Sequence, residues 1–181
     1  MTASDEPGLR DFALAVYRID GVSPASLLLQ DRCRVDVNVL LLAAYVGAVR
    51  GGAFGSAEAA EAHRRVAQWQ TDVVGPLRFL RERLREGPPP APSPSTAQLR
   101  ERVKALELDA ELIELEELAV FADELGTPPH TDRHGGAPDE RAAVAMNVVV
   151  HASACREPDA AERDAVAVIA VAAARYGNGV G

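Results

Sequence analysis

Four polar side chains lie between two apolar runs in the first quarter of the chain. They are Gln30, Asp31, Asp36 and Asn38. Carboxylate and amide oxygens in such a group suit a hard metal ion, and a pair of carboxylates suits general acid/base work. Asp31 and Asp36 flank an expected helix junction, so their oxygens could converge. These residues are therefore the candidate binding site.

The same residues also have a structural interpretation, which we favour. Asp36 is well suited to cap the helix that follows, by accepting the backbone N–H of Asn38 or Val39. Asn38, Gln30 and Asp31 would then bond neighbouring groups at the turn and fix a unique packing. A metal site would need a third hard ligand, and the nearby sequence supplies none, so no metal site is predicted.

Two histidines form the other arrangement with metal-binding character, the H-x-D-x-H segment from His130 to His134. They lie among prolines and glycines with no further cysteine or histidine close by, so a solvated loop is favoured over a four-ligand zinc site. The sequence contains no G-x-S-x-G, P-loop, G-x-G-x-x-G or H-E-x-x-H motif. We therefore assign no catalytic residue and expect no cofactor.

The run Val39–Val49 is apolar except at Gly47. A helix that is apolar on all sides is normally buried, and this one is shorter than the ~20 residues that span a bilayer. We expect a buried central helix over 37–50. Further apolar residues at helical spacing surround it, and no strand pattern competes, so the fold class is all-α, a bundle of about seven helices.

A long helical hairpin is expected from 57–86 and 96–125, on either side of the proline-rich linker 87–95. Gly75-Pro76 should kink its first helix, because proline removes a backbone hydrogen bond. Ser23, Ser56 and Thr96 are the expected N-caps of three helices. Large side chains should anchor a core that is rich in alanine and valine; they are Phe12, Tyr17, Tyr45, Trp69, Phe79 and Phe121.

Two units follow from these patterns. Residues 1–125 form a helical core domain, and 137–176 form a pair of alanine- and valine-rich helices that packs on it. Cys33 and Cys155 are expected to be buried free thiols.

The second helix of the hairpin carries two apolar stripes on different faces. One stripe is Leu99, Val103, Leu106, Ala110 and Ile113; the other is Leu108, Leu112, Leu115 and Ala119. A helix with two such faces contacts two neighbours, within the fold or across a dimer. The hairpin also carries strongly segregated charge, with arginines from Arg78 to Arg85 and acidic residues from Glu107 to Glu117. Some of these charges should pair across the hairpin.

The 181-residue chain has a net charge of −8, which argues against nucleic-acid binding and against an anionic membrane surface. Its N-terminal residues show no basic-then-apolar signal, and no apolar run reaches membrane length. We expect a cytoplasmic protein.

Three separated segments resemble one bacterial family, the domain of unknown function 2390. They are SLLLQDRCRVDVNVLLLAAYVG, which follows a pattern L-Q-D then D-V-N-x-L-L, WQTDVVGPLRFLRERLR and VKALELDAELIELEEL. Their order and spacing agree over about residues 9–118. The resemblance implies a small helical cytoplasmic protein and brings no activity, cofactor or catalytic residue.

The absence of a catalytic motif and the two-striped helix favour a non-enzymatic interaction or adaptor protein, with a protein partner or self-association. The alternative is a protein or enzyme that binds a small molecule or metal at Asp31, Asp36 and Asn38.

Overall fold

The computed structural model describes residues 8–126 and 136–179, and every regular element among them is a helix. This confirms the all-α prediction. The elements are α1 (Leu9–Tyr17), α2 (Val22–Cys33), α3 (Val37–Tyr45), η1 (Val46–Arg50), α4 (Ser56–Trp69), η2 (Gln70–Val74), α5 (Gly75–Glu86), α6 (Pro94–Leu125), α7 (Pro138–Ala154) and α8 (Ala160–Gly179). The two η elements are single π-helical turns that continue the preceding α-helix.

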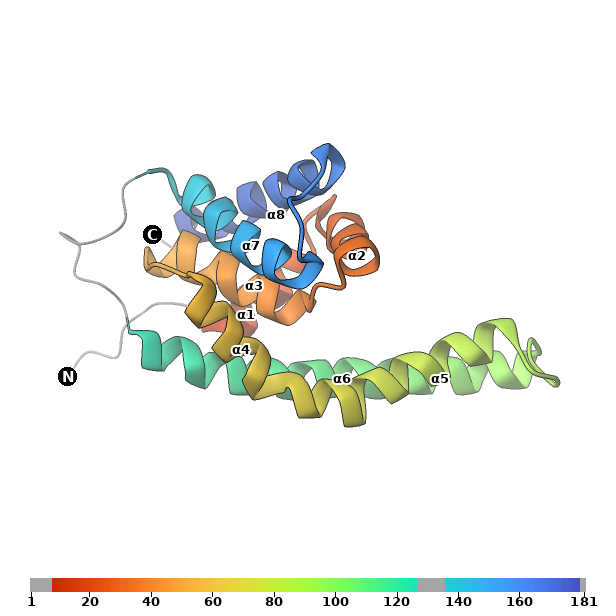
Figure 1. The fold of residues 1–181 in the computed structure, drawn as a ribbon. Helices are drawn as coiled ribbons and strands as arrows, with labels where there is room; N and C mark the ends of the chain where they lie inside the picture. The colour runs from red at the N-terminus through yellow and green to blue at the C-terminus, as the bar shows by residue number, and fades with distance from the viewer. Residues whose placement is uncertain (1–7, 127–135, 180–181) are drawn as a thin grey trace.

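The helices form a compact body and a long projecting hairpin. Figure 1 shows α1, α2, α3, α7 and α8 gathered on one side of α6, while α5 and the N-terminal half of α6 extend past them. Helix α4 leads from the body into the hairpin, and α5 runs alongside α6. The space between the body and the hairpin is therefore bounded by segments that are distant in the sequence.

Helix α3 is the buried centre of the body, as expected. All residues from Asn38 to Tyr45 are buried, and α3 packs on α7, α6 and α1. Asp36 caps its N-terminus by accepting the backbone N–H groups of Asn38 and Val39. The expected helix over 37–50 is continuous, but its last turn is the π-helix η1 and it ends where Gly51 adopts a φ of 68°.

The hairpin has its expected course, with a break of a different kind. The backbone N–H of Gly75 reaches back to the carbonyl of Gln70, which is the bond of a π turn. Pro76 has no N–H and sits in the first turn of α5, where that loss is harmless. The kink expected at Gly75-Pro76 thus takes the form of a π segment immediately before it.

Three of the expected caps were wrong by one to three residues. Helix α6 is capped by Ser93, and Thr96 completes a reciprocal pair of hydrogen bonds with it. Helix α4 follows Gly55, whose N–H donates to the Glu58 carboxylate, and α2 follows Gly21. In each case a neighbouring glycine or serine takes the extended or left-handed backbone that the helix entry requires.

The expected core anchors were partly wrong. Phe12, Tyr45 and Phe121 are buried, but Tyr17 is 38% exposed and Phe79 is 64% exposed. Phe79 lies on the projecting part of the hairpin, where no other described element covers it. The ring of Tyr45 packs at 5.2 Å from that of Phe12 and is itself contacted by Arg50.

The C-terminal helices α7 and α8 pack against each other and against α3, η1 and α2. The division into a core domain and a C-terminal pair stays a prediction. A buried carboxylate, Glu162, joins the start of α8 to the turn after α7 through two hydrogen bonds from Arg156. Both cysteines are free; Cys33 is buried, but Cys155 is exposed because it lies in the turn after α7.

Within residues 8–126 and 136–179, no single helix is both long and apolar enough to cross a bilayer. Helices α1 and α2 satisfy length and composition only as a pair, and that pair is bent by 101°.

Candidate functional site: a cleft between the body and the hairpin

A cleft of about 710 Å³ lies where the body meets the hairpin. Residues of α1, the α2–α3 junction and α3 form its body side, and residues of η2, α5 and α6 form its hairpin side. Its polar and charged lining residues are Arg18, Gln30, Arg34, Asp36, Asn38, Gln70, Arg78 and Glu111, and its apolar ones include Leu14, Tyr17, Leu41, Leu108, Leu112 and Leu115. The volume falls within the range of about 300–1,000 Å³ that small-molecule sites occupy.

The α2–α3 junction supplies the polar floor of the cleft. The Asp36 Oδ1 atom accepts the N–H of Asn38 at 2.9 Å and of Val39 at 3.3 Å. The Asn38 side-chain amide donates to the backbone carbonyl of Glu111 at 3.1 Å. Asn38 therefore holds the start of α3 against α6 and fixes how the hairpin meets the body.

Three of the four predicted site residues line this cleft: Gln30, Asp36 and Asn38. Asp31 is exposed and is not among the lining residues. The reason is the helical turn of α2, on which adjacent residues point about 100° apart. The expected pairing of Asp31 with Asp36 is therefore replaced by a different carboxyl group, and the binding role of the four residues stays a prediction.

That carboxyl group is Glu114, which the sequence reasoning missed as a site residue. It is 2% exposed, and the Gln70 side chain donates to its Oε2 atom at 2.6 Å. Burial and the neighbouring Asp36 carboxylate raise the pKa of Glu114 to about 9. At neutral pH Glu114 is thus a neutral acid that can donate its O–H to Asp36.

A signal for Glu114 was present in the sequence. Glu107 and Glu114 each follow the stripe residues Val103 and Ala110 by four positions, so they continue the face that packs on α5. A carboxylate at such a position must find a partner or become protonated. The sequence does not reveal which, because the partners come from η2, α5 and α3.

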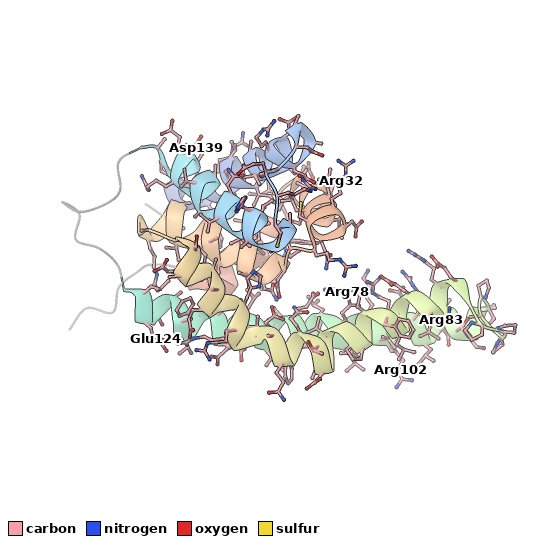
Figure 2. The ribbon with its side chains drawn as sticks, viewed as in Figure 1. Arg32, Arg78, Arg83, Arg102, Glu124 and Asp139 are labelled. Atoms are coloured by element: carbon pink, nitrogen blue, oxygen red, sulfur yellow. The ribbon has the colours of Figure 1, made fainter. Side chains whose placement is uncertain are left out.

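Glu107 has ion-pair partners. It is 6% exposed and lies between Arg78, at 3.1 Å, and Arg81, at 2.5 Å. Arg78 also reaches Glu111 at 2.8 Å, and Figure 2 shows it on the side of the hairpin that faces the body. Burial raises the pKa of Glu111, and the attraction of Arg78 opposes that rise. The charge pairing expected across the hairpin therefore exists, and part of it is buried beside the cleft.

The charges that remain unpaired at the cleft are positive. Asp36 is bound by backbone N–H groups and Glu111 by Arg78. Arg18 and Arg34 line the cleft with exposed side chains, and neither has an ion-pair partner among the described residues. Arg34 also adopts a left-handed φ of 56°, an unfavourable conformation for a residue with a side chain.

Two metal arrangements were considered from the sequence, and only one of them falls on described residues. His130, Asp132 and His134 lie outside the described residues. Among residues 8–126 and 136–179, no group of three or more histidine, cysteine, aspartate or glutamate side chains is placed to hold a metal ion.

Comparison with known proteins gives one family. No curated protein and no solved structure matches the chain. The sequence profile of a family described as a protein of unknown function, DUF2390, matches residues 9–118, which include the body side of the cleft through α3 and the whole hairpin to Leu118. The expected family and range are thereby confirmed, and the chain belongs to the DUF2390 family of proteins of unknown function.

Proposed function

We propose that this protein binds an amphipathic anion, a small molecule with an apolar body and one negatively charged group, in the cleft between the body and the hairpin. The observation that carries the proposal is the composition of the cleft wall. It combines a broad apolar surface with two unpaired arginines in a chain whose net charge is −8.

The apolar part of the ligand would lie against the leucines of α3 and α6. Leu108, Leu112 and Leu115, three of the four residues of the second stripe expected on α6, line this cleft. Leu108 is 51% exposed, although it is large and apolar. Covering such a surface is favourable by about 25 cal/mol for each Å² removed from water.

The anionic group would lie at Arg18 and Arg34. A guanidinium group binds carboxylate and phosphate oxygens with paired N–H donors, and an unpaired one at a cleft mouth retains this capacity. The two carboxylates of the wall do not oppose the anion strongly, because each is already bound by its own donors. A cationic ligand would have to displace those donors.

The π turn η2 supports a role for the hairpin side of the cleft. It carries Gln70, whose amide reaches Glu114 and lines the cleft. π turns interrupt regular helices at a cost in stability and are frequent at functional sites. Gln70 and Asn38 are thus held in fixed positions at the cleft by their hydrogen bonds to α6.

Calorimetric titration with decanoate tests the proposal, with decylamine as the matched ligand of opposite charge. We expect saturable binding of decanoate and at least about tenfold weaker binding of decylamine. Arg34→Glu should abolish decanoate binding, whereas Arg83→Glu, an exposed arginine of α5 away from the cleft, should leave it unchanged. Equal binding of both ligands, or equal effects of the two substitutions, would contradict the proposal.

The interaction or adaptor role expected from the sequence stays a prediction, and so does a cytoplasmic location. The interaction role now rests on the other apolar surface of α6, because Leu108 and Leu112 line the cleft.

A further inference from the structure

Helix α6 carries a straight row of exposed apolar residues on one face. Leu99, Leu106, Ile113 and Val120 are spaced by seven residues, and they are 45%, 55%, 51% and 54% exposed. A spacing of seven residues places side chains along one line of a helix, with a drift of about 20° per repeat. We call these four residues the outer row.

The outer row faces away from the rest of the molecule. Val103, Glu107, Ala110 and Glu114 are buried where α6 meets α5 and η2, and Leu115 and Leu118 belong to the core of the body. Figure 2 shows Arg102, which lies between Leu99 and Leu106 in the sequence, on the opposite side of the hairpin from Arg78. No described element covers this side of α6.

Two unpaired charges of opposite sign stand within the row. Arg102 and Asp109 are both exposed, and neither has an ion-pair partner among the described residues. Two acidic residues further along α6 behave differently: Glu116 pairs with Arg10 at 3.2 Å, and Glu117 lies 3.8 Å from Arg65. Arg102 and Asp109 thus lie on either side of Leu106 along α6.

We propose that the outer row binds a second copy of this chain, with the two α6 helices antiparallel and the twofold axis beside Leu106. Leu99 and Ile113 are each seven residues from Leu106, so reversal of the second helix places Leu99 opposite Ile113 of the second copy. The same reversal places Arg102 near Asp109 of the second copy, and the contact occurs twice.

The charge order is the reason to choose a second copy over an unrelated partner. A surface with a cation on one side of its centre and an anion on the other is complementary to itself after a twofold rotation. Two Leu106 side chains meet at the centre, and two Arg102–Asp109 pairs flank them. The row is short, so the dimer is a weak one that forms at micromolar or higher concentration.

Sedimentation velocity over a range of concentrations tests the proposal on the full chain. We expect a monomer–dimer equilibrium that Leu106→Glu weakens by about 100-fold, because two carboxylates would then be buried at the axis. Val144→Glu is the matched control, since Val144 is 67% exposed on α7, a body helix that packs against α8, α3 and η1. A monomer at all concentrations, or equal effects of the two variants, overturns the proposal.

A charge exchange tests the antiparallel register. Arg102→Asp and Asp109→Arg should each weaken the dimer by about 10-fold, and the double variant should restore it, because the exchanged pair has the same geometry with opposite polarity. Additive weakening in the double variant overturns the pairing. Decanoate binding to the same variants reports on the cleft separately, since neither residue lines it, so the two proposals fail independently.

Discussion

The Asp36 carboxylate before α3 acts on the buried carboxyl group of Glu114 on α6, and together with burial it raises the pKa of Glu114. The Gln70 side-chain amide donates to Glu114, and the backbone N–H groups of Asn38 and Val39 donate to Asp36. Glu114 and Asp36 thus connect the hairpin to the body beside the polar floor of the cleft. The protonation of Glu114 therefore makes the free energy of unfolding depend on pH.

Glu114→Gln should flatten the pH dependence of stability. The pKa of Glu114 in the folded protein is about 9, above its ordinary value of 4.5, so the folded state holds a proton that the unfolded state loses between these values. The stability linked to this proton is fully present below about pH 4.5 and is lost as the pH rises towards 9. Urea unfolding across this range should show a declining free energy for the native chain and a smaller decline for the variant.

The matched control for that measurement is Glu116→Gln, whose carboxylate is exposed. Its profile should follow that of the native chain. Parallel profiles for the native chain and Glu114→Gln would show that Glu114 does not carry the proton.

Asp36→Ala should lower the free energy of unfolding by about 0.5–2 kcal/mol through loss of the α3 cap. Asp31→Ala should change it by no more than about 0.5 kcal/mol, because Asp31 is exposed and has no hydrogen-bond partner among the described residues. Chemical denaturation of the two variants at neutral pH makes the comparison. Equal losses would mean that Asp31 has a structural role that its position does not indicate.

Glu162 should govern stability on the acid side. Hydrogen bonds from Arg156 and from the backbone of Asp159 lower its pKa to about 2. Its contribution is therefore present above its ordinary pKa of 4.5 and is lost as the pH falls towards 2. The native chain should lose thermal stability between about pH 5 and pH 3, and Glu162→Gln should lose less over the same range. A native chain equally stable at both pH values would contradict this assignment.

Gly47→Ala should destabilise the packing of α7 on the central helix by about 1–3 kcal/mol. A Cβ atom at Gly47 would lie 2.7 Å from the Arg141 carbonyl oxygen and 2.8 Å from the Ala142 Cα, both of them backbone atoms that cannot move aside. Gly177→Ala on α8 is the control, because its Cβ would meet Ala48 and Val49 at ordinary contact distances. That variant should be stabilised by up to about 1 kcal/mol through its higher helix propensity.

The features that the sequence predicted well are formed by local interactions along the chain. The run after Asp36 is apolar at nearly every position, so a buried, capped helix was predictable from Asp36 to Val49. The hairpin was predictable because its apolar spacing continues on both sides of a proline-rich linker. These features depend on neighbours within a few turns of the same chain.

The contacts between residues that are distant in the sequence could not be predicted. The meeting of Asn38 with the Glu111 carbonyl, and of Gln70 with Glu114, depends on the angle at which the hairpin leaves the body. Phe79 is a large aromatic residue of the kind that usually lies in a core, but no described element outside the hairpin covers it. The position of Asp31 was predicted wrongly for a local reason. Adjacent residues on a helix point about 100° apart, so Asp31 does not share the helix face of Gln30.

The most direct test of the cleft as a ligand site uses Trp69, the single tryptophan of the chain. Its indole N–H donates to the Ala110 carbonyl at 3.0 Å, and it precedes Gln70 at the cleft. Titration with a decanoate that carries a terminal bromine should quench Trp69 fluorescence in a saturable way, and Arg34→Glu should remove the quenching while Arg83→Glu retains it. Quenching that rises linearly without saturation, or that is the same in both variants, would contradict a binding site at this cleft.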